Sequence, residues 1–361
     1  MKVIFILTRS ITFNTFLKSQ AYFLKKRGLN VEIACSDPQN LDSKNYLKHK
    51  INFPSTKKQI FYLFNYIKIF LQIKNLVDKN PKSIFYLHTP VASHLFRLFN
   101  FFKSVKIIYF VHGFRFTSKT KYIKRIFFKI IEKILSFKTN IFITINNEDY
   151  NYAKLNLNQK AFYYKINGIG LNFVKKNLKR LRKKTIIKKI LVIAAYKKEK
   201  GYLDILNLAD VLRNQNIQIS CYGYGCSDIF EKLKIKKNLK NIHFNKFDKK
   251  LENKIKKFDI LLHLSAREGL PVAVMQSLVN GLPVICYNIR GNNDLIINNY
   301  NGYFVKSYVE AAKKIYFLNL EKNIFDNMRI NAYNSIDKSF SKDQINSILF
   351  KIIKSINMYK K

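Results

Sequence analysis

Residues 265–285 bring together residue types that can bind a phosphate and a sugar side by side. The segment follows an apolar run and continues into a helical pattern, and Pro271 suits the first position of that helix. The backbone N–H groups of Gly269 and Leu270 would then point outward from the helix N-terminus, where free amides form a common diphosphate site. The carboxylate of Glu268 beside them can accept hydrogen bonds from sugar hydroxyls. The pattern favours a sugar-diphosphate site, with an ordinary strand–turn–helix unit as the alternative.

Polar or small residues follow other apolar runs in the same way. Lys200 comes after one such run, and Gly223 and Gly225 come after the next. Residues that directly follow the strands of an open α/β sheet lie at the edge where its ligands bind, so these positions are candidates for a site. In the first half of the chain, His112 follows an apolar run in the same way. Taken alone, it is best interpreted as a histidine that only completes the wall of a cleft.

Short apolar runs that alternate with helical patterns position these residues. The runs are Val3–Leu7, Val31–Cys35, Ile84–Leu87, Lys106–Val111 and Ile141–Ile145, then Ile190–Ala195, Gln218–Tyr222, Asn241–Phe244, Asp259–Leu264 and Pro283–Tyr287. Strands that are apolar on both faces and alternate with helices predict a parallel sheet covered by helices. Ligands of such sheets bind beyond the carboxyl ends of the strands. We therefore predict an α/β chain of two doubly wound, Rossmann-like domains that face an interdomain cleft.

The domain boundaries follow from where this alternation stops and restarts. A chain of 361 residues is long enough for two domains with separate cores. We expect the first domain at residues 1–172 and the second at 190–338, joined by a basic linker at 173–189. Residues 339–361 are predicted to form a helix that packs back toward the first domain.

Two helical patterns in the first domain have apolar stripes. The first stripe consists of Phe13, Phe16, Leu17, Ala21 and Leu24, and the second of Ile123, Ile126, Phe127, Ile130, Ile131 and Ile134. In the second pattern Phe128 lies off the stripe, among lysines and an arginine. Basic residues with exposed aromatic side chains suit an anionic membrane surface. A core helix with solvated lysines is the alternative.

The order of these motifs resembles that of retaining glycosyltransferase family 4, which has the GT-B fold. The segments that carry the resemblance are His88-Thr89-Pro90, His112-Gly113-Phe114, Glu199-Lys200-Gly201, Gly223-Tyr224-Gly225, Arg267 to Leu278 and Arg290 to Ile296. They extend over nearly the full chain. The first half resembles bacterial capsule, exopolysaccharide and lipid-linked oligosaccharide transferases more than starch or sucrose enzymes.

The resemblance implies a retaining transfer of a hexosyl or N-acetylhexosaminyl group in surface polysaccharide synthesis. The donor would be a nucleotide-sugar, by default a UDP-sugar, and the acceptor a saccharide or a polyprenyl-diphosphate-linked saccharide. The first domain would lie on the acceptor side and the second would bind the donor. No cofactor and no metal are expected, because the chain has no Asp-x-Asp motif that could bind a metal.

The resemblance also gives roles to single residues. His112 and Glu268 would be catalytic. The donor-binding residues would be Lys200, Gly223, Gly225, Glu268, Gly269, Leu270, Pro271 and Gln276. Acceptor-side residues would be Thr12, His88 and Arg115.

The chain departs from the family pattern at Gln276, Ala195 and Asn293 and in the loop Thr8–Asn14, which lacks paired glycines. Gln276 stands where the family usually has a second glutamate for the ribose, and Ala195 replaces a basic residue. A neutral amide binds hydroxyls less strongly than a carboxylate, so a weakened or inactive homologue is one alternative. A nucleotide-sugar epimerase and a non-enzymatic, basic nucleic-acid-binding protein are two others.

Charge and cysteine usage suggest where such a protein works. The 66 Lys and Arg against 22 Asp and Glu give a net charge of +44, which attracts anionic lipid headgroups, phosphate-rich substrates or nucleic acid, although genome composition accounts for part of the excess. The motifs indicate no specific nucleic-acid partner. The four cysteines lack metal-ligand spacing, and no run approaches the length of a membrane span. We expect a cytoplasmic protein at the inner face of the membrane, in peripheral contact with anionic lipid.

Overall fold

The computed structural model describes residues 1–42, 45–56, 59, 63–101, 103–118, 120–172, 186–248 and 250–356. The chain divides into two compact units: Met1–Gly170 with Ser341–Lys361, and Leu171–Phe340. Most of the basic linker expected at 173–189 lies outside the described residues. Among the described residues, no helix has both the length and the apolar character that a membrane crossing requires.

The first unit is built on a seven-stranded sheet in the order β3-β2-β1-β4-β5-β6-β7. All neighbouring strands are parallel. The strands are β1 (Lys2–Ile6), β2 (Asn30–Cys35), β3 (Leu47–Lys50), β4 (Ile84–Leu87), β5 (Lys106–Val111), β6 (Ile141–Thr144) and β7 (Phe162–Lys165). Central strands such as β4 are buried along their whole length, which explains their unalternating apolar sequence.

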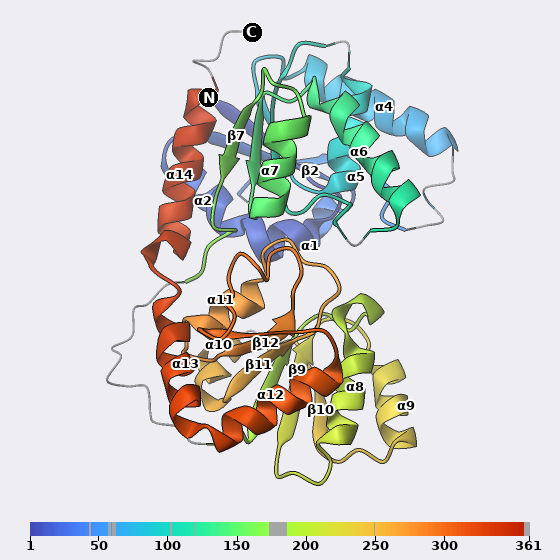
Figure 1. Ribbon diagram of the computed structural model, residues 1–361. Helices are drawn as coiled ribbons and strands as arrows, with labels where there is room; N and C mark the ends of the chain where they lie inside the picture. Colours follow the sequence, from blue (N-terminus) through green and yellow to red (C-terminus); the bar gives the residue numbers. More distant parts are fainter. Residues whose placement is uncertain are drawn as a thin grey trace. The chain divides into compact units, whose positions relative to one another are not determined.

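Helices cover both faces of this sheet (Figure 1). They are α1 (Ser10–Thr12), the π-helix η1 (Phe13–Leu17), α2 (Lys18–Lys26), the short 3-10 helix η2 (Pro38–Asn40), α4 (Leu63–Asp78), α5 (Pro90–Phe99), α6 (Tyr122–Ser136), α7 (Asn147–Asn156) and α14 (Lys342–Ser355). Helices α4 to α7 share one core cluster beneath the sheet. Helices α2 and α14 pack together, and η1 lies on the opposite face, where Phe13 contacts Phe5 with ring centroids 6.2 Å apart.

The second unit repeats the design with a six-stranded parallel sheet in the order β10-β9-β8-β11-β12-β13. The strands are β8 (Lys189–Ile193), β9 (Gln218–Gly223), β10 (Ile242–Lys246), β11 (Ile260–His263), β12 (Val284–Tyr287) and β13 (Gly302–Val305). The helices are η4 (Lys198–Lys200), α8 (Tyr202–Val211), α9 (Asp228–Lys236), α10 (Leu251–Lys254), η5 (Ile255–Lys257), α11 (Val272–Leu278), α12 (Tyr308–Leu320), α13 (Lys322–Asn334) and η6 (Lys338–Phe340). Two doubly wound, Rossmann-like units are confirmed, and the interdomain cleft stays a prediction.

The last helix of the chain, α14, belongs to the first unit. Ser341 begins it by accepting a hydrogen bond from the backbone N–H of Gln344 at 3.3 Å. Its apolar face packs on α2, where Phe350 and Phe23 lie with ring centroids 6.5 Å apart. Residues from opposite ends of the sequence therefore complete one core (Figure 1).

The stripe predicted near the start of the chain is wrong at one position. Phe13, Leu17, Ala21 and Leu24 are fully buried, but Phe16 is 43% exposed. The reason is the π-helical stretch Phe13–Leu17. Its wider turn aligns residues four apart better than residues three apart, so Phe16 is turned away from the core.

Helix α6 faces the sheet with the side opposite to the predicted stripe. Phe128 was expected among exposed cations, yet it is only 9% exposed. Ile131, assigned to the stripe, is partly buried against the core. Phe127 and Ile130, on the stripe, are 58% and 53% exposed. The expectation of an exposed Phe128 is therefore wrong, and so is the alternative of a core helix that buries the whole stripe.

A buried charge explains this orientation. Glu132 of α6 is 1% exposed and accepts a hydrogen bond from Nη2 of the fully buried Arg97 at 2.8 Å. His94 Nε2 lies 2.8 Å from its other carboxylate oxygen. Burial raises the pKa of Glu132, but Arg97 and His94 outweigh it and hold the pKa at about 2. Since a buried guanidinium needs an anion, α6 turns Glu132 inward and its isoleucines outward.

We expect Glu132→Ala to lower the free energy of unfolding by about 3–5 kcal/mol, because Arg97 would stay buried without its anionic partner. Denaturant unfolding at pH 7 measures the change. The control is Lys133→Ala at the exposed neighbouring position, which should change stability by less than about 0.5 kcal/mol. Equal effects of the two substitutions would show that the pair does not fix the orientation of α6.

Candidate functional site

The turn after β11 and the turn after β8 meet at the carboxyl edge of the second sheet. Glu268 lies in the first turn, and Lys200 ends η4 in the second. Lys200 Nζ and Glu268 Oε1 are 2.6 Å apart. Their side chains are 22% and 16% exposed, so the pair is largely buried yet open to a ligand.

Glu268 is held as an anion. Burial raises its pKa, but His263 and Lys200 offset this effect and set the pKa at about 2. His263 Nε2 lies 3.5 Å from the same oxygen, Oε1, that contacts Lys200. Within the described part of the chain, Oε2 of Glu268 accepts no hydrogen bond, which leaves one carboxylate oxygen to receive a ligand hydroxyl.

Backbone contacts hold the two turns together. The N–H of Ala266 donates to the carbonyl oxygen of Glu199 at 2.9 Å. Gly201 has φ +78°, and a Cβ there would lie 2.1 Å from the carbonyl oxygen of Leu264. Only glycine fits this left-handed, closely packed position, so the sequence Lys200-Gly201 positions the lysine beside the Glu268 turn.

The loop after β12 supports Glu268 from the other side. Arg290, which is 4% exposed, donates from Nε to the carbonyl oxygen of Glu268 at 2.9 Å. Gly291 has φ +82°, and a Cβ there would lie 2.3 Å from the carbonyl oxygen of Gly269. The backbone on both sides of the Glu268 carboxylate is therefore fixed.

Helix α11 begins one residue later than predicted. Pro271 is its N-cap, with φ −74° and ψ 115°, and not its first helical residue. Its carbonyl oxygen accepts the first helical hydrogen bond, from Val274 at 3.1 Å. In the described structure the N–H groups of Gly269 and Leu270 make no hydrogen bond, so the expected free amides are present. Gln276 lies on a partly exposed side of α11.

The structural reason for a glycine differs between Gly223 and Gly225. A Cβ at Gly223 would lie 2.0 Å from the carbonyl oxygen of Ala194, so the missing side chain makes room for the neighbouring strand of this protein. Gly225 has φ +99° and no atom closer than 3.8 Å to an added Cβ. A ligand could therefore approach the backbone closely at Gly225, where there is open space, but not at Gly223.

An aromatic pair lies at the same edge and escaped the sequence interpretation. Tyr224 follows β9 and Phe247 follows the adjacent strand β10, and their rings stack with centroids 3.9 Å apart. They are 47% and 38% exposed. The available signal was two aromatic residues directly after neighbouring strands, where parallel strands bring their carboxyl ends together.

In the first unit, His112 follows β5 and contacts His88, which follows β4. His88 Nδ1 and His112 Nε2 are 3.2 Å apart, so one ring donates to the other. His88 is fully buried between Phe5, with ring centroids 5.2 Å apart, and Tyr86 at 4.3 Å. His88 therefore lies beneath His112 and presents no surface to an acceptor.

Both histidines are kept neutral by their surroundings. Burial lowers the pKa of His112 to about 4, although its side chain keeps partial access to solvent. Burial, and then the neighbouring His112, lowers the pKa of His88 well below its ordinary value. A neutral His112 can donate or accept one hydrogen bond at its free nitrogen.

The other residues predicted on the acceptor side are Thr12 and Arg115. Thr12 ends α1 and is partly exposed. The guanidinium of Arg115 lies over the ring of Phe128, 4.9 Å from its centroid. None of the interactions found in the described residues joins them to His112.

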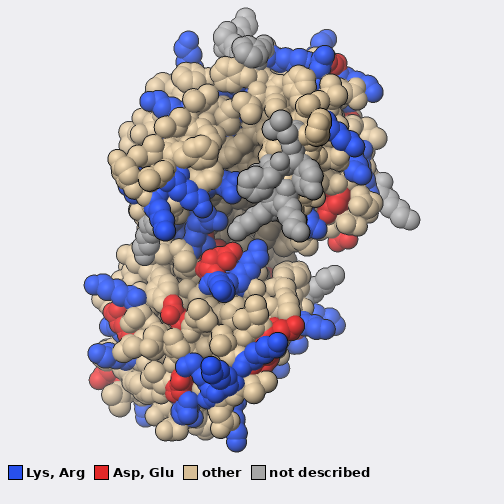
Figure 2. All heavy atoms as spheres, turned by 90° about the vertical axis from the view of Figure 1, so that its right-hand side faces the viewer, with Lys and Arg blue, Asp and Glu red and all other residues tan. Residues whose placement is uncertain are grey.

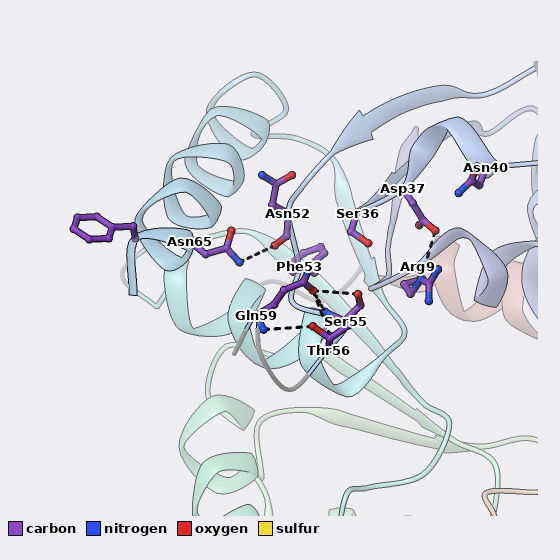
Figure 3. A pocket seen from close by; sticks show the side chains of 11 residues that line it. Arg9, Ser36, Asp37, Asn40, Asn52, Phe53, Ser55, Thr56, Gln59 and Asn65 are labelled. Carbon is purple, nitrogen blue, oxygen red and sulfur yellow. Dashed lines mark hydrogen bonds and ion pairs between the residues drawn. The ribbon is translucent and has the colours of Figure 1, made fainter. Parts of the chain in front are cut away.

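A polar cavity of about 700 Å³ lies at the carboxyl ends of β1, β2 and β3 (Figure 3). Its lining includes Arg9, Ser36, Asp37, Asn40, Asn52, Ser55, Thr56, Gln59 and Asn65. Asp37 accepts hydrogen bonds from the N–H and Oγ of Ser10, at 2.7 and 2.9 Å, and lies 3.5 Å from Arg9. The sequence interpretation missed this cavity because β3, beyond whose end Asn52, Ser55 and Thr56 lie, has no apolar run and was not predicted.

Comparisons with known protein families agree with this arrangement. The family described as glycosyl transferase 4-like matches residues 2–146, and the family described as glycosyl transferases group 1 matches residues 174–335. EpsD of Bacillus subtilis (strain 168), a protein assigned to the glycosyltransferases, is 26% identical over 328 residues, which cover 86% of this chain and 85% of EpsD. An Escherichia coli UDP-Gal:alpha-D-GlcNAc-diphosphoundecaprenol alpha-1,3-galactosyltransferase is 23% identical over 300 residues, 75% of this chain and 77% of that protein.

Solved structures share the fold at low sequence identity. Sucrose-phosphate synthase from Thermosynechococcus elongatus superposes with a TM-score of 0.81, 12% identity and 99% coverage of both chains. HepE from Anabaena, solved with UDP and glucose, gives a TM-score of 0.76 at 13% identity, covering 98% of this chain and all (100%) of HepE.

The neutral state of His112 predicts a pH effect on stability. Between pH about 6.5, where an unfolded histidine titrates, and the folded pKa of about 4, the unfolded chain binds a proton that the folded chain does not. Stability therefore falls as the pH drops through this range. We expect His112→Asn to lose less unfolding free energy between pH 7 and pH 5 than the parent chain does.

Denaturant unfolding at the two pH values measures this difference. His243→Asn, at an exposed position of β10, is the control and should keep the parent's pH dependence. An unchanged pH dependence in His112→Asn would contradict a buried, neutral His112.

Proposed function

This chain belongs to the GT-B glycosyltransferases, and on that premise we propose that it transfers a hexosyl or N-acetylhexosaminyl group from a UDP-sugar to a saccharide or polyprenyl-diphosphate-linked saccharide in the cytoplasm. Its general role as a glycosyltransferase of polysaccharide synthesis follows from the two matching families and from the relatives. The finer assignment is supported by the name of the E. coli relative, which specifies UDP-Gal and a diphosphoundecaprenol-linked acceptor.

The observation that carries the proposal is the half-used carboxylate of Glu268. Its Oε1 accepts a hydrogen bond from Lys200 Nζ and lies 3.5 Å from His263 Nε2. In the described structure its Oε2 accepts no hydrogen bond, so it can bind a ligand hydroxyl. A carboxylate with a pKa of about 2 is ionised at every physiological pH and accepts strong hydrogen bonds from hydroxyl groups. In the proposed complex, Oε2 of Glu268 binds hydroxyls of the donor sugar.

The donor diphosphate is proposed to bind beside this carboxylate. The free N–H groups of Gly269 and Leu270 donate to the phosphate oxygens, and Lys200 contributes a positive charge. A lysine has three N–H donors, so Lys200 can contact a phosphate while it keeps its bond to Glu268. These groups supply the positive charge that a metal provides in other transferases, so the proposed reaction needs no metal.

The proposed reaction retains the configuration of the donor sugar. The bond between the anomeric carbon and the diphosphate oxygen breaks, and the acceptor hydroxyl oxygen forms a new bond on the same face. The acceptor proton passes to the departing diphosphate, whose charge Lys200 stabilises. His112 is proposed to hydrogen-bond the donor sugar near the reacting carbon through its free ring nitrogen. Trapping of a covalent glycosyl-enzyme would contradict this step.

The aromatic pair Tyr224 and Phe247 is proposed to stack on the donor base. Its rings are exposed at the carboxyl edge that also carries Glu268, and stacking holds a base without strict selectivity. Gln276 is proposed to bind the ribose, with about 1–2 kcal/mol less affinity than a carboxylate would give, because a neutral hydrogen bond is weaker than a charged one.

The acceptor is proposed to bind to the first unit. The cavity at the ends of β1 to β3 is lined mainly by neutral hydroxyl and amide side chains (Figure 3). Such groups donate and accept hydrogen bonds in the pattern that a saccharide offers. Thr12 and Arg115 keep their proposed roles near the acceptor, whereas the buried His88 is better explained as the support of His112.

Substitutions at the ion pair test the proposal. Thermal shift with UDP- and GDP-sugars first identifies the donor, because a ligand of the native state raises the melting temperature. With that donor and a saccharide acceptor, we expect Lys200→Met to lower kcat about 100- to 1,000-fold. We expect Glu268→Gln to lower kcat/KM about 10- to 100-fold, the effect of losing a charged hydrogen bond.

The matched control is Glu199→Gln, which changes an exposed glutamate next to Lys200. It should leave kcat/KM within about twofold of the parent value, since its side chain lies outside the pair. If Glu268→Gln behaves like Glu199→Gln, the proposed role of Glu268 is wrong.

The stacking proposal predicts that Phe247→Ala weakens UDP binding. A stacked base contributes about 1–3 kcal/mol, so the dissociation constant measured by calorimetry should rise roughly 5- to 100-fold. Phe317→Ala is the control, because Phe317 has the same 38% exposure on α12. Similar dissociation constants for both variants would remove the aromatic pair from the donor site.

A further inference from the structure

Helix α6 presents an apolar face to solvent. The exposed residues are Ile123, Ile126, Phe127, Ile130, Ile134 and Phe137, which are 83%, 37%, 58%, 53%, 51% and 61% exposed. At 100° per residue these positions lie on one side of the helix, opposite the buried Phe128, Glu132 and Leu135. Exposed apolar residues that gather in this way mark an interaction surface.

Helix α4 has the same arrangement. Phe64, Ile67 and Leu71 are 85%, 58% and 55% exposed and lie on one side of α4, while Ile69 and Ile73 on the other side are fully buried in the core. Helix α5 packs against both α4 and α6 and adds Leu98, which is 53% exposed. We call the exposed apolar side of these three helices the α4–α6 face.

Charge around the α4–α6 face is positive. Lys124 and Lys133 flank the apolar side of α6, and Lys68 and Lys74 flank that of α4. The acidic residue of α6, Glu132, is buried against Arg97, and Asp78 at the end of α4 is paired with Lys103. Figure 2, which views this side of the molecule, shows a broad uncharged surface on the upper unit with Lys and Arg side chains at its margins.

The buried Glu132 makes the exposure a fixed property of the fold. Turning α6 to bury its isoleucines would carry Glu132 out of the core and leave Arg97 without its anion. Removing one partner of such a pair costs several kcal/mol. The isoleucines thus stay outside the core and are available to another partner.

We propose that the α4–α6 face docks on the surface of an anionic lipid bilayer, with its apolar side chains among the acyl chains and its lysines at the headgroups. Amphipathic helices with this division of apolar and basic residues lie in the plane of the bilayer interface. A second copy of the chain is a poorer occupant, because two such faces would bring their lysines together on a chain of net charge +44. The proposal does not depend on the transfer reaction.

Vesicle co-sedimentation of the full-length chain tests the proposal, with vesicles of phosphatidylcholine alone or mixed with phosphatidylglycerol. We expect binding to the anionic vesicles that weakens with salt. The double substitution Ile123→Ser and Phe127→Ser should weaken this binding about tenfold or more, because two side chains that enter the acyl region are lost.

The control is the double substitution Leu155→Ser on α7 and Ile235→Ser on α9. These two apolar residues lie outside the α4–α6 face and are 76% and 74% exposed. It should bind like the parent. An unchanged melting temperature and an unchanged UDP affinity would show that the Ile123/Phe127 variant is folded. A loss of vesicle binding in this variant is then independent of donor binding.

Three outcomes would overturn the proposal. One is equal binding of the parent chain to neutral and anionic vesicles. Another is equal loss of binding in the two double variants. The third is an absence of vesicle binding combined with a concentration-dependent dimer that Ile123→Ser and Phe127→Ser abolish, which would assign the α4–α6 face to a second copy of the chain.

Discussion

The ion pair between Lys200 and Glu268 is the contact on which the proposed donor site depends. It joins two turns that follow different strands, and it forms only because the backbone lets them approach. Gly201 lies against Leu264 and Gly291 lies against Gly269, each at a distance that a Cβ would make impossible. By allowing this close approach, the glycines bring Lys200 and Glu268 into contact. In the described structure the same geometry leaves Oε2 of Glu268 and the amides before α11 without hydrogen-bond partners.

A second ion pair controls the first unit in an analogous way. Arg97 and Glu132 are both buried, and their contact decides which side of α6 meets the sheet. Apolar burial alone would favour the opposite orientation, since each buried isoleucine or phenylalanine contributes about 1.5–3 kcal/mol. The structure shows the electrostatic requirement prevailing at α6, because Glu132 is the carboxylate that pairs with the buried guanidinium, whereas isoleucines can remain at the surface.

The sequence predicted the central parts of both sheets and the residues at their edges, for a physical reason. Strands buried on both faces have continuous apolar runs, as at β4 and β6, and parallel strands place the following residues at one edge. The edge strands β3 and β7 are half exposed and have no such run, so they were missed. The orientation of α6 stayed open in the sequence analysis, because periodicity defines a stripe without defining what faces it. Its decisive partner, Arg97, lies 35 residues away in the chain.

Stability alone does not explain the arrangement around Glu268. A largely buried ion pair costs desolvation that its Coulomb attraction does not fully return, and apolar residues of similar size often stabilise a protein as well or better. The Lys200–Glu268 pair lies beside two backbone amides, of Gly269 and Leu270, that have no hydrogen-bond partner in the described structure. Oε2 of Glu268 is also without a partner there. A ligand with hydroxyls and phosphates would satisfy all of these groups at once. Gln276 of α11 is not one of these groups, so the departure from the family pattern at that position leaves the set intact.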